Sequence, residues 1–240
     1  CDLICNLGFP NKLKFNNNLK KKNYLISLKN ILNILKKKKN FKLIHISSSE
    51  VYGFKKITNK LSYAENVKTL PQNPYGKAKL DAENLILKSN LKIINNTIIL
   101  RLFNIYGIGQ THKTIINVII SKLLLNKKRI KLKNIYDERD YIFLNDAIDA
   151  IRYSLLSKNI SGVYNVSTGK TISVKNIFQV IKDIIGKNQV KLLDSKNFEY
   201  SNFSCGKNLK IRKKIGWKPK HSSIEDFKKN IKKMLIYKNN

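Results

Sequence analysis

Apolar residues occur along the chain in short runs that are bounded by polar turns. In residues 41–46, one such run is supplied by Phe41, Leu43, Ile44 and Ile46. Runs of this length, without strict alternation, are typical of strands that are buried on both faces of a sheet. The same pattern predicts strands at residues 1–9, 97–102, 130–135, 141–144 and 162–166.

Between the predicted strands, apolar residues recur at the spacing of one helix face. From position 24 to position 37 they stand at 24, 25, 28, 31, 32 and 35, which predicts a helix that packs on the core. A second helix is predicted at 75–89, because Pro74 suits a first turn and the residues after it favour helix. Further helices are predicted at 115–125, 147–157 (capped by Asn145 and Asp146), 174–185 (ended by Gly186) and 224–237.

This alternation of strands and helices predicts an α/β protein with a parallel sheet. Two segments lack a clear pattern, and we interpret residues 10–22 as a polar loop and residues 190–210 as loosely ordered. No uninterrupted apolar stretch reaches the roughly 18 residues of a membrane-spanning helix, so we expect no association with a membrane.

Candidate chemistry stands where the strand at 41–46 ends. The polar residues that follow this strand are Ser47, Ser48, Ser49 and Glu50. In open α/β sheets, ligands bind outside the carboxyl ends of the strands, which is where these side chains would lie. On the next predicted helix, Tyr75 and Lys79 share one face, with their Cβ atoms roughly 5–6 Å apart. Hydroxyl, phenol and ammonium groups that converge in this way predict a proton-transfer site.

The proposed base in this site is the Tyr75 phenol. A free phenol has a pKa of about 10 and is a poor base at neutral pH. We expect the Lys79 ammonium to favour the phenolate and to lower this pKa towards the working range. Ser48 would hydrogen-bond the same substrate hydroxyl. A Tyr-x-x-x-Lys spacing alone arises by chance in Lys-rich chains, so the hypothesis depends on the preceding Ser-Ser-Ser-Glu-Val-Tyr-Gly stretch.

These stretches resemble the extended short-chain dehydrogenases/reductases, the NAD-dependent epimerase/dehydratase family that acts on nucleotide sugars. Four later stretches carry the resemblance on, in the family's order, across nearly the whole chain. They are Arg-Leu-Phe-Asn-Ile-Tyr-Gly (101–107), Arg-Asp-Tyr-Ile-Phe-Leu-Asn-Asp (139–146), Gly-Val-Tyr-Asn-Val-Ser-Thr-Gly (162–169) and Ile-Gly-Trp-Lys-Pro (215–219).

The resemblance implies a Rossmann-type parallel sheet and a smaller α/β substrate lobe. Residues 1–110 would form a partial NAD(P)-binding domain, and residues 111–240 mainly the lobe, interleaved with the sheet. The first βαβ unit, which carries the Gly-rich pyrophosphate loop, would precede Cys1, so we interpret the chain as truncated at its N-terminus. The implied cofactor is NAD, with NADP as an alternative. Its implied contacts are Leu7, Gly8, Ser47, Tyr75 and Lys79.

The resemblance also implies a nucleotide-sugar substrate, a UDP- or GDP-hexose, and a homodimer formed through the helices at 24–37 and 75–89. Ser49 and Asn104 would contact the sugar nucleotide, and Arg139 its diphosphate. From the sequence alone, Arg139 has an alternative role as the partner of Asp140 or Glu138 in a surface ion pair.

Glu50 is the residue that bears on the reaction type. Relatives that lose water or carbon dioxide have Glu at this place, and the dehydratases pair it with an Asp general acid where this chain has Ser49. We therefore predict 4-epimerisation, with 4,6-dehydration or decarboxylation as the alternative. A second alternative is an inactive fragment, because Lys207 replaces the family's Asp and no second diphosphate Arg occurs between positions 190 and 204.

Composition adds three further expectations. The formal charge of +33 comes from scattered lysines that accompany abundant Asn and Ile, without a nucleic-acid motif, so we do not predict nucleic-acid binding. The cysteines Cys1, Cys5 and Cys205 form neither a disulfide framework nor a metal-ligand pattern, which indicates a reduced, cytoplasmic setting without a metal. His45 is interpreted as a strand residue and not as a base.

Overall fold

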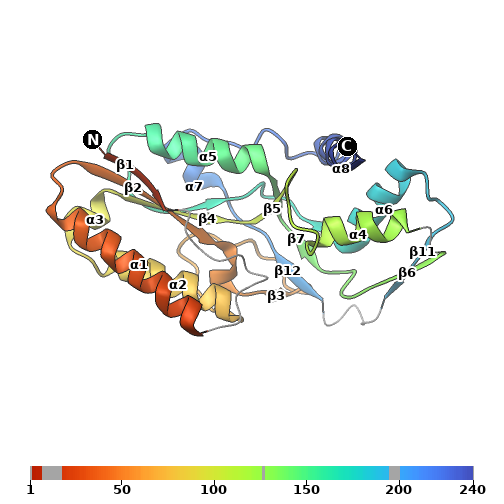
Figure 1. The fold of residues 1–240 in the computed structure, drawn as a ribbon, viewed down its shortest axis with the longest axis horizontal. Helices are drawn as coiled ribbons and strands as arrows, with labels where there is room; N and C mark the ends of the chain where they lie inside the picture. Colours follow the sequence, from red (N-terminus) through yellow and green to blue (C-terminus); the bar gives the residue numbers. More distant parts are fainter. Residues whose placement is uncertain (1, 7–17, 126–127, 195–200, 240) are drawn as a thin grey trace.

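The computed structural model describes residues 2–6, 18–125, 128–194 and 201–239 (Figure 1). Its main sheet has four strands in the order β1-β2-β4-β9, and all neighbours pair in parallel. This confirms the predicted α/β fold with a parallel sheet. The strands are β1 (Asp2–Asn6), β2 (Phe41–Ser48), β4 (Thr97–Leu102) and β9 (Gly162–Val166).

Helices cover both faces of this sheet (Figure 1). One face packs on α1, α2 and α3 and the other on α5 and α7, so neighbouring strand residues such as Leu43 and Ile44 are buried in different clusters. This two-sided burial explains why the strands are apolar without strict alternation. The covering helices are α1 (Asn18–Lys37), α2 (Pro74–Leu87), α3 (Leu91–Asn95), α5 (Leu144–Leu156) and α7 (Leu209–Ile215).

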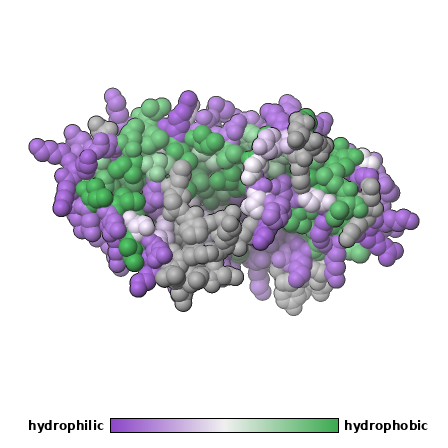
Figure 2. Space-filling view, in the orientation of Figure 1, coloured by the Kyte–Doolittle hydropathy of each residue, from purple (hydrophilic) through white to green (hydrophobic). Residues whose placement is uncertain are grey.

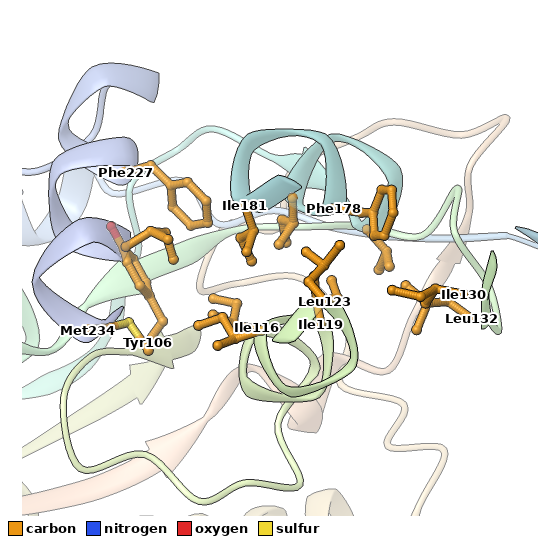
Figure 3. Packing of buried hydrophobic residues seen from close by; sticks show 14 of the residues in the cluster. Tyr106, Ile116, Ile119, Leu123, Ile130, Leu132, Phe178, Ile181, Phe227 and Met234 are labelled. Carbon is orange, nitrogen blue, oxygen red and sulfur yellow. The ribbon is translucent and has the colours of Figure 1, made fainter. Parts of the chain in front are cut away.

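A second core lies beyond the carboxyl ends of the sheet (Figure 3). In it, Ile119 of α4, Ile181 of α6 and Met234 of α8 pack together with Ile130 of a short strand. Figure 3 shows Tyr106 and Phe227 at one end of this cluster and Leu132 at the other. The elements are α4 (Ile115–Leu124), α6 (Val174–Ile185), α8 (Ile224–Asn239), β6 (Arg129–Leu132) and β11 (Lys191–Asp194).

Short strands join the two parts. Pairing of β5 with β8 places Asn104 next to Tyr141. A second small sheet has the order β10-β7-β12-β3. β9, α5 and α7 follow residue 110 and yet belong to the main sheet layer, so the later half of the chain is interleaved with the sheet. The strands are β3 (Lys55–Lys56), β5 (Asn104–Tyr106), β7 (Glu138–Arg139), β8 (Tyr141–Phe143), β10 (Ile172–Ser173) and β12 (Asn202–Ser204).

The two interpretations of segments without a clear pattern are wrong where the structure describes these segments. The segment at 190–210 contains β11, β12 and the start of α7, because β11 pairs with the distant β6 and β12 with β7. Partners so far away in the sequence leave no local pattern. The predicted loop at 10–22 is helical from Asn18 onwards. Of the predicted strand at 1–9, the part after Asn6 lies outside the described residues.

The predicted cap of α5 is also wrong. The helix begins at Leu144, and its N-cap residue, Phe143, makes no side-chain cap. Asp146 lies inside the first turn, where its buried carboxylate accepts hydrogen bonds from the backbone N–H groups of Lys220 and His221 and contacts the His221 ring. The acidic side chain therefore anchors a distant loop instead of capping its own helix.

Hydrophilic residues occur all around the outline of the molecule in Figure 2 and do not gather into one stripe on that face. Apolar patches lie between them. This dispersed pattern agrees with lysines that are spread over separate helices and turns. We do not propose nucleic-acid binding.

Candidate active site

A cavity of about 800 Å³ opens at the carboxyl ends of β2 and β4. This is the place where a parallel sheet is expected to bind a ligand. Seven of the predicted site residues line the cavity. Arg139 is not among its lining residues, and Leu7 and Gly8 lie outside the described residues. The seven are Ser47, Ser48, Ser49, Glu50, Tyr75, Lys79 and Asn104.

A tight turn connects β2 to the cavity. Ser48 ends the strand and caps a short 3₁₀ helix, η2 (Ser49–Tyr52), by accepting a hydrogen bond from the Glu50 N–H at 3.2 Å. The start of α2 packs closely on this turn, since a Cβ at Gly76 would lie only 2.5 Å from the Glu50 carbonyl oxygen. Glycine at this position therefore lets the Tyr75 backbone approach the serines.

Asn73 holds the same junction with its side chain. Its Oδ1 accepts the Gly76 N–H at 2.8 Å and thereby caps α2, while its Nδ2 donates to Glu50 Oε2 at 2.6 Å. The Glu50 carboxylate, which is buried, is thus oriented by the helix that carries Tyr75. The sequence analysis missed Asn73, although an Asn directly before Pro is a recognisable N-cap signal.

Tyr75 and Ser48 are brought together as predicted. The two side chains line the same cavity, and the phenol is largely buried. Burial raises the pKa of Tyr75 to about 12, and the neighbouring Glu50 carboxylate acts in the same direction, whereas the Ser48 hydrogen bond lowers it. The expectation that Lys79 brings the pKa below its ordinary value is wrong for the protein without ligands, because loss of solvent outweighs any nearby positive charge.

Lys79 lies one turn beyond Tyr75 and is only 3% exposed. Its Nζ donates to the backbone oxygen of Ile46 at 2.7 Å and lies 5.9 Å from the centroid of the Tyr75 ring. Burial lowers the pKa of Lys79 to about 7, and Glu83 acts in the opposite direction. This ammonium therefore titrates within the range in which enzymes commonly work.

Beneath the cavity floor lies a buried ion pair. Glu83 on α2 accepts hydrogen bonds from Arg101 on β4, at 3.0 Å from Nε and 2.6 Å from Nη2, and from the Ser47 hydroxyl. The Arg101 guanidinium also stacks over the Tyr52 ring, with Cζ 4.7 Å from its centroid. Ser47 was predicted to contact the cofactor, but its hydroxyl donates its hydrogen bond to Glu83.

Asn104 reaches the cavity from the end of β5. Its side-chain Nδ2 and its backbone N–H both donate to the backbone oxygen of Asp140, at 3.0 and 3.1 Å. The Asp140 carboxylate is fully buried and accepts hydrogen bonds from the backbone N–H groups of Thr168, Gly169 and Gly206. Burial raises the pKa of Asp140 to about 6. Asp140 therefore connects two loops, the one after β9 and the one before α7, to the segment that orients Asn104.

Arg139 lies in β7, where it forms an ion pair with Asp137 at 2.8 Å and stacks over Phe54 at 4.1 Å. An ion pair was one of the two predicted roles, but the predicted partners, Asp140 and Glu138, are wrong. Side chains alternate across a strand, so Asp137, two positions away, shares the face of Arg139. The Arg139 Nη1 is buried and has no hydrogen-bond partner among the described residues.

Behind the cavity, His45 is fully buried in β2, as predicted for a strand residue. Its Nδ1 lies 3.4 Å from Asn6 Nδ2, and its Nε2 lies 3.3 Å from the Tyr24 hydroxyl. Burial lowers the pKa of His45 from 6.5 to about 3, with Lys79 acting in the same direction. The folded protein therefore holds this imidazole neutral.

We expect this buried histidine to make the protein sensitive to acid. Between about pH 6.5 and pH 3 the unfolded chain binds a proton that the folded chain excludes, so the free energy of unfolding falls as the pH is lowered through this range. Denaturant unfolding at pH 7 and pH 5 should show that the free energy of unfolding falls less in His45→Gln than in the wild type. Asp140, whose pKa is about 6, contributes equally to the pH dependence of both proteins, so its contribution cancels when they are compared. Equal losses would contradict the assignment.

A family model described as GDP-mannose 4,6 dehydratase matches residues 17–234. The chain belongs to the NAD-dependent epimerase/dehydratase family. The members of this family modify nucleotide sugars. Among the described residues there is no group of side chains that could hold a metal ion, and no helix there is long and apolar enough to cross a bilayer.

The chain is similar to the following two relatives and one solved structure. A putative UDP-glucose 4-epimerase of Methanocaldococcus jannaschii is 31% identical over 88% of this chain and 67% of its own length. A dTDP-D-glucose 4,6-dehydratase of Dictyostelium discoideum is 32% identical over 74% of this chain but only 42% of its own length. A dTDP-glucose 4,6-dehydratase of Bacillus anthracis, solved in complex with NAD, superposes with a TM-score of 0.80 at 20% identity, covering 99% of this chain and 72% of that structure.

Proposed function

We propose that the protein is a nucleotide-sugar 4-epimerase, similar in reaction to UDP-glucose 4-epimerase. The observation that carries this proposal is the Tyr75 phenol, which lines the cavity together with Ser48 and lies one helical turn from the Lys79 ammonium. In the proposed reaction Tyr75 takes the proton of the sugar 4-hydroxyl while Ser48 holds that hydroxyl in line. The 4-keto sugar then turns over in the cavity, so that C4 regains its hydride on the other face, and protonation of the same oxygen by Tyr75 completes the epimerisation.

The proposed cofactor is NAD, whose nicotinamide would supply the chemistry of accepting a hydride from C4 and returning it. The residues at the cavity fit its nicotinamide-ribose end, since the Lys79 ammonium and the Tyr75 phenol, both hydrogen-bond donors, line the cavity together. We assign Lys79 and Tyr75 to the ribose. Lowering the Tyr75 pKa from about 12 requires positive charge beside the phenol, which Lys79 supplies when it is charged and oxidised nicotinamide would add. The sequence contains no Gly-x-Gly-x-x-Gly, so we expect these residues alone to bind NAD weakly.

We propose that the substrate is a UDP- or GDP-hexose whose nucleotide lies towards the lobe formed by α4, α6 and α8. Asn104 and Ser49 line the cavity on the way to this lobe and would bind the sugar nucleotide. Arg139 has a buried Nη1 without a hydrogen-bond partner in the described structure, and a diphosphate oxygen is a suitable acceptor for it. A side-chain movement would be needed, because Arg139 does not line the cavity.

The alternative reaction is loss of water or carbon dioxide from the keto sugar. It is favoured by Glu50, whose carboxylate lies in the cavity and is oriented by Asn73. Such a base would remove the proton next to the 4-keto carbon. A departing hydroxyl also needs a proton donor, and Ser49, which stands next to Glu50, is a poor acid. For this reason we favour epimerisation over dehydration.

Product analysis tests the proposal. The protein is expressed from the longest reading frame that contains the 240 residues and is incubated with NAD and UDP- or GDP-hexoses, and the products are identified by NMR. We expect the C4 epimer. A product in which C6 is deoxygenated or removed would replace epimerisation by the alternative reaction. No turnover of any hexose would favour the inactive alternative.

We also propose self-association through α1 and α2. Both helices expose apolar side chains, with Ile34 61% exposed and Leu87 42% exposed. In sedimentation experiments at micromolar concentration we expect a dimer that Ile34→Lys converts to monomer. The control is Leu156→Lys on α5, on the other face of the sheet, where the side chain is 70% exposed. A wild-type monomer, or equal effects of the two variants, would contradict this interface.

A further inference from the structure

Lys79 faces an aromatic ring that the proposed reaction does not use. Its Nζ lies 5.3 Å from the centroid of the Tyr24 ring, slightly closer than its 5.9 Å approach to the Tyr75 ring. Tyr24 comes from α1, is 6% exposed and packs in the cluster between α1, α2 and the sheet. The cavity is not lined by Tyr24, so this ring lies behind the ammonium as seen from the substrate.

The Tyr24 ring is held from the other side by His45. The two rings stack with their centroids 6.5 Å apart and their planes inclined by 28°. The Asn6 amide nitrogen can only donate, so His45 Nδ1 accepts its hydrogen bond and the proton of the neutral ring sits on Nε2. His45 Nε2–H then donates to the Tyr24 oxygen. Asn6 and His45 are also register partners of β1 and β2, which fixes this order.

The buried Lys79 ammonium is stabilised by an aromatic ring beside it. Several charged or titratable groups surround Lys79, but the nearest carboxylate, Glu83, already accepts hydrogen bonds from Arg101 and Ser47. The face of an aromatic ring attracts a cation through its quadrupole without a charge of its own, and this attraction strengthens where water is excluded. The groups that face Lys79 are Tyr75 and Glu83 from α2, Tyr24 from α1, His45 from β2 and, through Glu83, Arg101 from β4.

We propose that Tyr24 is a positioning residue for Lys79. Its ring, stacked on the His45 ring and packed between α1 and the sheet, holds the ammonium at the cavity in its charged form. The inference rests on the proposed function in one respect, namely that Lys79 acts on the bound cofactor and on Tyr75. It adds a residue of α1 to a site otherwise built from β2, η2, α2 and β5, and it gives the buried His45 a role.

The test is a direct titration of Lys79, which requires no turnover. Lysine side chains are labelled with ¹³C at Cε, and the resonance that titrates near neutral pH and is missing in Lys79→Met is assigned to Lys79. We expect Tyr24→Leu, which removes the ring, to lower the Lys79 pKa by about one unit. Tyr24→Phe keeps the ring in the apolar cluster and should leave the pKa within about 0.3 units of the wild type.

The difference between the two variants separates an aromatic effect from a packing effect. Equal shifts in Tyr24→Leu and Tyr24→Phe, or no shift in Tyr24→Leu, would overturn the proposal. If turnover is detected, the pH at which kcat/KM falls should move with the Lys79 pKa in Tyr24→Leu and stay in place in Tyr24→Phe. An absence of turnover would refute the proposed function and leave the NMR titration as a valid test of the Tyr24 contact.

Discussion

Replacing Tyr75 by phenylalanine should lower kcat by about 10²–10⁴-fold, the usual contribution of a positioned acid–base group. The variant removes only the phenol hydroxyl at the cavity and keeps the ring beside Lys79. We expect the free energy of unfolding to change by no more than about 1.5 kcal/mol, the worth of one hydrogen bond. Steady-state kinetics with the substrate identified by product analysis would measure the loss.

The matched control for this prediction is Tyr164→Phe. Tyr164 is also a buried tyrosine of the main domain, and its hydroxyl donates to the Ser161 backbone oxygen at 2.9 Å, away from the cavity. This variant should retain turnover, and its free energy of unfolding should change by about as much as that of Tyr75→Phe. Undiminished turnover in Tyr75→Phe would remove the base assignment, and equal losses in both variants would show that the effect is structural.

The largest loss of stability is expected from Arg101→Met. This variant leaves the Glu83 carboxylate, whose side chain is 1% exposed, in the core without its cation. Breaking one partner of a buried pair typically costs about 3–5 kcal/mol, because the remaining charge is neither solvated nor paired. Denaturant unfolding should report this decrease in the free energy of unfolding. Ser47 alone cannot compensate for a charge-assisted, two-point contact.

Two further variants separate charge burial from packing. In the double variant Arg101→Met, Glu83→Leu no unpaired charge remains, and we expect most of the lost stability to return. The exposed pair of Lys228 and Glu225 serves as the reference, since Lys228→Met should cost less than about 1 kcal/mol. A loss in Arg101→Met no larger than in Lys228→Met would contradict the role that we assign to the buried pair.

Short sequence patterns predict those features of the fold and site that depend on residues close together in the sequence. The apolar run at 41–46 and the Pro74 helix start appear in the structure as β2 and α2, within two residues of the predicted ends for α2. The end of α6 is likewise confirmed, since Gly186 adopts a left-handed conformation directly after Ile185. In each case the signal and its structural consequence lie within a few residues of each other.

Other features depend on contacts that span the chain. Glu83 and Arg101 are 18 positions apart, and their ion pair becomes visible only when α2 packs on β4. The pairing of β11 with β6 joins segments that have no common pattern in the sequence. The Glu83 signal was nevertheless available, because a residue four positions after Lys79 shares its helix face.

The pKa of Tyr75 shows a different reason for error. A pairwise argument from the Tyr-x-x-x-Lys spacing considers the cation and omits the loss of water around the phenol. In the structure the phenol is buried and its pKa rises to about 12, while the pKa of Lys79 falls to about 7. Burial opposes the charged form of both groups, and its extent cannot be read from residue spacing.

The most direct test of the central claim is the fate of a deuterium placed at C4 of the UDP- or GDP-hexose that the protein accepts. If the protein epimerises the sugar through oxidation at C4, NMR and mass spectrometry will find the epimer with the deuterium still at C4. A deoxy product with the deuterium at C6, or an epimer that has exchanged its C4 deuterium for solvent hydrogen, would contradict the account.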